Sequence, residues 1–137
     1  MTPARRQGQT RRTSAAEARA YLSKAQEFLR AAEDALALRS YVVVTGNAVH
    51  AGIAAADAIS ASRAGMVWKG EHSQAPAHLE QAAGPDGSRA AGHLRRLVPM
   101  KNRAEYDPDP IPASEARAAV TSAARLVRLA ANVVGAP

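Results

Sequence analysis

The 137-residue sequence predicts an all-α fold, an antiparallel bundle of four to five helices. Apolar residues recur at three- and four-residue steps through long alanine- and valine-rich runs, which is the period of a helix face. A single segment, 40–45, has the β-branched composition of a strand, and no partner strand is evident for it. Proline and glycine clusters separate the helical runs at short intervals.

Length and composition predict one helical domain, over 14–137, behind a basic tail at 1–13. The absence of cysteine excludes a disulfide framework, thiolate metal sites and a cysteine nucleophile. The amino terminus lacks the apolar core of a signal peptide. No run of about 18 uncharged apolar residues is present, so we expect no membrane segment and a cytoplasmic protein.

The positive charge is concentrated in the tail. The net charge is +6, and Arg5, Arg6, Arg11 and Arg12 lie within 1–13 with no acidic residue among them. We expect this tail to be disordered, either as a solubilising segment or as an arm that seeks phosphates. A DNA-binding protein driven by the tail is the weakest of three functional hypotheses.

The first two helices are predicted from Ser14 to about Arg39 and from about Ser40 to Arg63. Ser14 begins a capping-box pattern, in which a hydroxyl and a carboxylate satisfy free amides at a helix start. The second helix is apolar nearly all round, so it is expected to be central and buried. Gly46 and Gly52 weaken that helix, and such a cost suggests close packing at both positions.

The remaining chain is divided by prolines. The expected elements are a turn region at 64–71, a short helix with Pro76 in its first turn that ends at 84–87, a helix capped by Ser88, and a last helix from Ser114. Pro99 should kink or split the helix that follows Ser88. The segment 107–112 contains three prolines and cannot be helical.

A polar cluster follows Pro99. Its members are Lys101, Asn102, Arg103, Glu105 and Tyr106. The cations could hold a phosphodiester, and the phenol could donate a hydrogen bond to it. Alternatively, Arg103 and Glu105 cap and salt-bridge a helix end while Tyr106 packs under the proline-rich segment. Composition leaves both interpretations open.

The four histidines give a weaker signal. His50 and Asp57 are seven residues apart and share one face of the second helix, as a catalytic base with its partner or as a satisfied interior pair. His72 and His78 lie beside a loop, and no histidine pair has metalloprotease spacing. Phosphate-binding and dinucleotide glycine motifs are also absent from the sequence. We therefore expect neither a metal site nor a cofactor.

Four features in order resemble the HEPN superfamily, the small α-helical domains of prokaryotic toxin–antitoxin and defence systems. They are an amphipathic first helix, the His50-containing second helix at 47–59, Lys69-Gly70-Glu71-His72, and Arg103-Ala104-Glu105-Tyr106-Asp107-Pro108 before the last helix. The resemblance covers roughly residues 15 to 134 and its motif is short. It implies a four- or five-helix bundle that forms a homodimer.

The resemblance also implies a function. Active members are metal-independent ribonucleases with an Arg, a polar residue and a His in one motif, and these positions match Lys101, Asn102 and Tyr106. Both key positions depart from that pattern, although a branch of the superfamily has Tyr at the last one. The leading hypothesis is a domain that binds RNA or a nucleotide phosphate, with Arg103, Glu105, His50 and Asp57 as further binding residues. The alternative is a non-catalytic interaction module that acts with a nucleotidyltransferase-type antitoxin partner.

Overall fold

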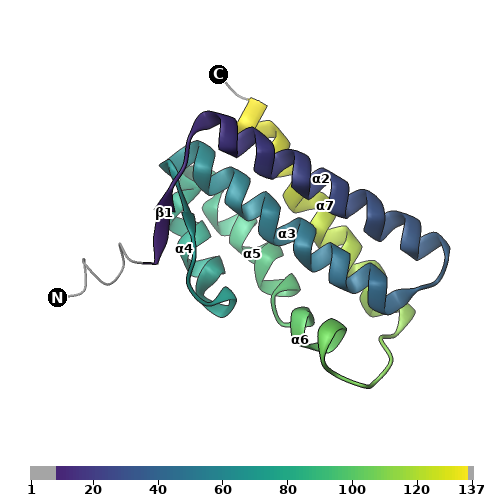
Figure 1. The fold of residues 1–137 in the computed structure, drawn as a ribbon. Coiled ribbons are helices and arrows are strands. Elements are labelled where there is room, and N and C mark those ends of the chain that lie inside the picture. Colours follow the sequence, from purple (N-terminus) through teal and green to yellow (C-terminus); the bar gives the residue numbers. More distant parts are fainter. Residues whose placement is uncertain (1–8, 136–137) are drawn as a thin grey trace.

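The computed structural model describes residues 9–135 and confirms an all-α architecture (Figure 1). The elements are β1 (Thr10–Arg12), α2 (Ala15–Ala37), α3 (Tyr41–Ala64), β2 (Met66–Trp68), α4 (Ala75–Ala82), α5 (Gly87–Leu97), α6 (Met100–Glu105) and α7 (Ala113–Gly135), with 3-10 turns at His72–Gln74 and Gly84–Asp86. The strand-like segment 40–45 is helical, as predicted, because it continues into the apolar run that follows it.

Helix α3 is the centre of the bundle. It packs against α2 and α7, and most of its residues are buried, as its apolar composition predicts (Figure 1). A Cβ atom added to Gly52 would collide with Leu97 of α5, so the predicted close approach is confirmed at that glycine. By length and composition α3 could also cross a membrane, but 61% of its most apolar window is buried within the fold.

The amino-terminal segment differs from the disordered tail that we predicted. Thr10–Arg12 forms a short antiparallel strand pair with Met66–Trp68, in which Arg11 lies opposite Val67. Pairing with a strand that the sequence analysis treated as a turn satisfies the backbone of both segments. Residues 1–8, which include Arg5 and Arg6, lie outside the described residues.

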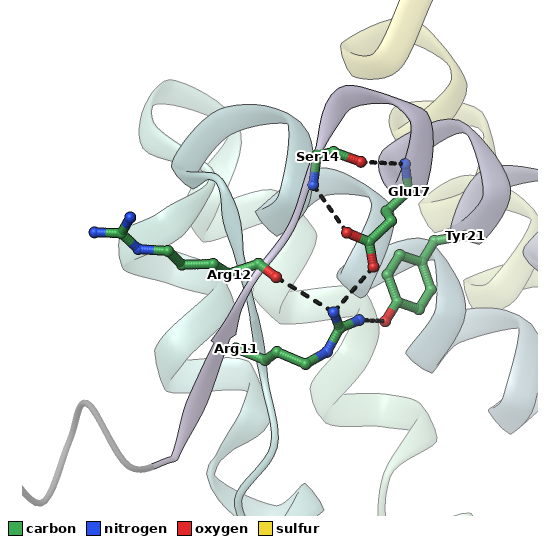
Figure 2. Close-up of polar contacts among 5 residues, drawn as sticks. All are labelled: Arg11, Arg12, Ser14, Glu17 and Tyr21. Carbon is green, nitrogen blue, oxygen red and sulfur yellow. Dashed lines mark hydrogen bonds and ion pairs between the residues drawn. The ribbon is translucent and has the colours of Figure 1, made fainter.

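Arg11 joins β1 to α2 (Figure 2). Its guanidinium donates to Glu17 Oε2 at 2.9 Å and to the Tyr21 hydroxyl at 2.8 Å. Glu17 also completes the predicted capping box with Ser14. The Arg11 side chain is therefore held by contacts within the fold, whereas the side chain of Arg12 extends away from this group (Figure 2).

The proline breaks lie where the sequence places them. Pro76 is in the first turn of α4, and Pro99 separates α5 from α6. One detail was wrong: α5 begins at Gly87, and Ser88 makes no capping hydrogen bond. A Cβ atom at residue 87 would collide with the backbone carbonyl oxygen of Glu80, so close packing against α4, rather than a capping hydroxyl, determines this helix start.

The segment between α6 and α7 is extended, as predicted for its prolines. Ile111 anchors it, since this side chain is buried in a small cluster with Ala35, Val44 and Ala116. The expectation that Tyr106 packs under this segment was wrong, because Tyr106 is 74% exposed. An aliphatic side chain fills the site instead and needs no polar partner for a hydroxyl.

Candidate functional site

Helix α6 brings two of the predicted residues against α3. Lys101 Nζ lies 3.3 Å from Glu105 Oε2, one helical turn away on the same face. The other Glu105 oxygen, Oε1, lies 3.9 Å from Nε2 of His50 on α3. The His50 ring is supported by Phe28 of α2, at 5.1 Å between ring centroids. The structure thus unites Lys101, Glu105 and His50, which are distant in the sequence.

His72 is a fourth member of this group. It lies at the start of the 3-10 turn after β2, close enough to Lys101, His50 and Glu105 for their charges to act on it. Partial burial lowers the pKa of His72, and the positive charges of Lys101 and His50 lower it further, against a smaller opposing effect of Glu105. His72 is therefore neutral at neutral pH and able to accept a proton. We call His50, His72, Lys101 and Glu105 the α6 cluster.

Arg103 belongs to a different contact. Its guanidinium donates to Glu115 Oε1 of α7 at 2.6 Å. This hydrogen bond raises the pKa of Arg103 and lowers that of Glu115. The alternative in which Arg103 forms a structural ion pair is therefore the arrangement observed, and α6 is tied to α7 through it.

Asn102 and Tyr106 lie at the exposed end of α6. The backbone carbonyl of Asn102 accepts hydrogen bonds from the amides of Tyr106 and Asp107, which closes the helix. The amide side chain of Asn102 and the phenol of Tyr106 make no polar contact within residues 9–135. Both side chains remain available to a ligand, beside the α6 cluster rather than inside it.

Asp57 is separated from His50 although they share a face of α3. It lines a cavity of about 150 Å³ enclosed by α3, the segment after β2, α4 and α5. Burial raises the pKa of Asp57 to about 7, and the positive charges of Lys69, Lys24 and Arg11 oppose this increase. His72 also lines this cavity, so it connects Asp57 with the α6 cluster.

The α6 cluster contains side chains of the kinds that can bind a phosphodiester without a metal ion. The ammonium of Lys101 supplies a point charge for a phosphate oxygen. The two imidazoles, His50 and His72, are side chains of the kind that accept and donate protons in catalysis. Glu105 is the one carboxylate of the group, and it competes with any incoming anion for Lys101.

His72 is the member of the α6 cluster that sequence reasoning did not select as a site residue. Its position within Lys69-Gly70-Glu71-His72 was part of the resemblance, but its six-residue spacing from His78 suggested only a weak metal pair. Within residues 9–135, no group of three or more His, Asp or Glu side chains could hold a metal ion. A usable signal is the turn after Trp68, since it returns the chain to α3 beside Asp57.

The site stands on this geometry. Contacts join His50 of α3 to Glu105 and Lys101 of α6, and His72, in the turn after β2, lies within range of their charges. Neither a protein-family model, nor a curated protein, nor a solved structure matches this chain.

Proposed function

We propose that this chain is a HEPN-like cytoplasmic domain that binds RNA or a nucleotide phosphate at the α6 cluster. The observation that carries the proposal is the convergence of His50 and His72 with Lys101 and Glu105. A phosphate placed against Lys101 would have two imidazoles within its surroundings, and Asn102 and Tyr106 lie at the same end of α6. These groups supply both charge and hydrogen bonds to phosphate oxygens.

The same groups are suited to metal-independent cleavage of RNA. One imidazole would accept the proton of the attacking 2′-hydroxyl, and a second proton donor would protonate the leaving 5′-oxygen. The position at which active family members have His is Tyr106 in this chain, so His50 and His72 would transfer these protons instead. Lys101 would stabilise the additional negative charge of the transition state. Activity as a toxin of a toxin–antitoxin pair follows from this chemistry.

Binding and metal-free digestion of RNA test the proposal together. Anisotropy of a labelled single-stranded RNA is measured in chelator for the parent protein and for His72→Ala, His50→Ala and Lys101→Ala. Arg30→Ala is a control, since Arg30 is exposed on α2 and has no ion-pair partner within the described chain. We expect the three cluster variants to weaken binding while the control does not. Equal affinity in all five proteins would refute the site.

A second function, an interaction module, is favoured by exposed apolar side chains. Leu38 is 78% exposed, Val42 46% and Val43 52%, all around the turn between α2 and α3. An apolar group of this kind marks contacts with another protein more often than with nucleic acid. The partner would be a second copy of the chain or a nucleotidyltransferase-type antitoxin. Sedimentation of the parent beside Val42→Lys tests the dimer, which the lysine should dissociate.

A further inference from the structure

The cavity beside Asp57 is a small, partly open site next to the α6 cluster. Its polar lining comes from Asp57 and Ser60 of α3, Lys69, His72, and His78 of α4, with Trp68 as an aromatic wall. Its apolar lining includes Ile53, Leu79 and Leu94. A volume of about 150 Å³ is too small for a whole nucleotide. It equals the space of about five water molecules, which is the scale of one planar heterocycle.

Asp57 supplies a carboxyl group to this cavity. Its carboxyl accepts no hydrogen bond from residues 9–135, although its side chain is largely enclosed. Burial without donors disfavours its charge, which is why its pKa rises to about 7. A carboxylate in such a position gains most from a ligand that presents two neighbouring N–H groups, because each oxygen then accepts one bond.

Lys69 adds a donor on the same cavity. It lines the cavity with Asp57. Of the positive charges that oppose burial and lower the pKa of Asp57, that of Lys69 has the largest effect. The pair therefore offers one positive donor beside one bidentate acceptor. The pairing edge of guanine has the complementary order: a carbonyl oxygen, then two N–H groups. Adenine presents an amino donor beside a ring acceptor, which an ionised carboxylate cannot match at both oxygens.

We propose that the Asp57 cavity binds a guanine base, with Asp57 accepting from its two adjacent N–H groups and Lys69 donating to its carbonyl oxygen. Trp68 provides a flat aromatic wall, held in place by a 2.9 Å hydrogen bond from its indole nitrogen to the Glu71 carbonyl. His78 lies against the Trp68 ring at 5.2 Å between centroids, with the two ring planes tilted by 33°. Aromatic walls of this kind bind bases through their π faces.

The position of His72 gives this site a role in the proposed function, on which the inference rests. His72 lines the cavity and also lies near His50 and Lys101. A guanine in the cavity would leave its ribose and phosphate directed toward the α6 cluster. The cavity would then select the nucleotide whose phosphate the cluster binds.

Fluorescence of Trp68 reads this site directly, because Trp68 is the only tryptophan of the chain. Guanosine and adenosine, which contain no phosphate, are titrated against the parent, Asp57→Asn, Lys69→Ala and the control Asp34→Asn at about pH 8. Asp34 is exposed on α2, so its variant matches the change of charge. We expect guanosine to quench Trp68 at least about tenfold more tightly than adenosine. This preference should be lost in Asp57→Asn, weakened in Lys69→Ala and kept in Asp34→Asn.

The phosphate site is tested separately by GMP and by Lys101→Ala. If guanosine leaves Trp68 unquenched, or adenosine binds equally well, the base site is refuted even where RNA binding still depends on Lys101. If guanosine binds through Asp57 but GMP gains no affinity from Lys101, the base site stands and the proposed phosphate site fails. Lys69→Ala, at an exposed position, keeps the test valid should Asp57→Asn fail to fold.

Discussion

Glu105 Oε1 lies 3.9 Å from His50 Nε2, while the second oxygen of the same carboxylate lies 3.3 Å from Lys101 Nζ. One acidic side chain thus contacts both a cation and an imidazole of the proposed phosphate site. The His50 contact joins α6 to α3, whereas the Lys101 contact lies within α6. Glu105 also places a negative charge where we propose that a phosphate binds, and this charge offsets that of Lys101.

Removal of that charge should strengthen anion binding. We expect Glu105→Gln to bind single-stranded RNA about fivefold more tightly, since two like charges about 4 Å apart repel by about 1 kcal/mol in water. Glu27→Gln, at an exposed position of α2, is the control. Fluorescence anisotropy at low salt is the measurement. Weaker binding by Glu105→Gln would show that the carboxylate positions the cluster rather than competing with the ligand.

Asp57 should make stability depend on pH. Its pKa is raised from 3.8 to about 7 in the folded protein, so the native state holds this proton more tightly than the unfolded state does. The free energy of unfolding therefore falls as pH rises between these two values. Asp57→Asn removes that loss and should be more stable than the parent at about pH 8, by up to about 4 kcal/mol.

Urea denaturation of the parent, Asp57→Asn and Asp34→Asn at several pH values measures this effect. The advantage of Asp57→Asn should shrink steadily as pH falls from about 7 to below 3.8, where the parent carboxyl becomes largely protonated in both states. Asp34→Asn should follow the parent throughout. An advantage of constant size at all pH values would contradict the titration of Asp57.

The close contact between Gly52 and Leu97 should make glycine necessary in α3. Gly52→Ala places a methyl group against a buried leucine, and overpacking of this kind costs about 1–3 kcal/mol, more than the helix propensity it gains. Gly92→Ala is the matched control, because no atom lies within 4 Å of its added Cβ. That variant should gain up to about 1 kcal/mol. Thermal denaturation distinguishes the two, and a gain in both would exclude the contact.

The strand pair should depend on Arg11. Arg11→Ala removes the hydrogen bonds to Glu17 and Tyr21 that join β1 to α2. We expect faster amide hydrogen exchange at the strand pair Thr10–Arg12 and Met66–Trp68, with α3 unchanged. Arg12→Ala serves as the control, since its side chain extends away from the Arg11 group (Figure 2). Equal exchange in the two variants would show that backbone pairing alone maintains the strands.

Local rules predicted most of the helices. The capping box at Ser14, the break at Pro99 and the apolar period of α3 depend on neighbouring residues, so a single sequence contains the signal. The β1–β2 pair could not be predicted in this way, because two three-residue strands are stabilised by their pairing with each other, by Arg11 and by the packing of Val67 with Ala18 and Ala61. Pairing of segments this distant is a property of the folded chain.

The candidate site could be predicted only in part, because it too combines a local contact with long-range ones. Lys101 and Glu105 share a helix face, and their contact follows from their spacing. The positions of His50 and His72 near this pair depend on how α3 and the turn after β2 pack, which no local pattern specifies. Conversely, the sequence suggested Arg103 as a phosphate ligand, because its contact with Glu115, on a separate helix, follows only from the folded structure.

The Arg103–Glu115 pair has a mechanical consequence for the cluster. Helix α6 spans only Met100–Glu105, and isolated helices of this length do not persist in water. Its order is therefore supplied from outside, by α3 on one side and by α7 through Arg103. A binding partner that moves the start of α7 would act on α6 through this ion pair, and α6 carries Lys101 and Glu105 of the cluster.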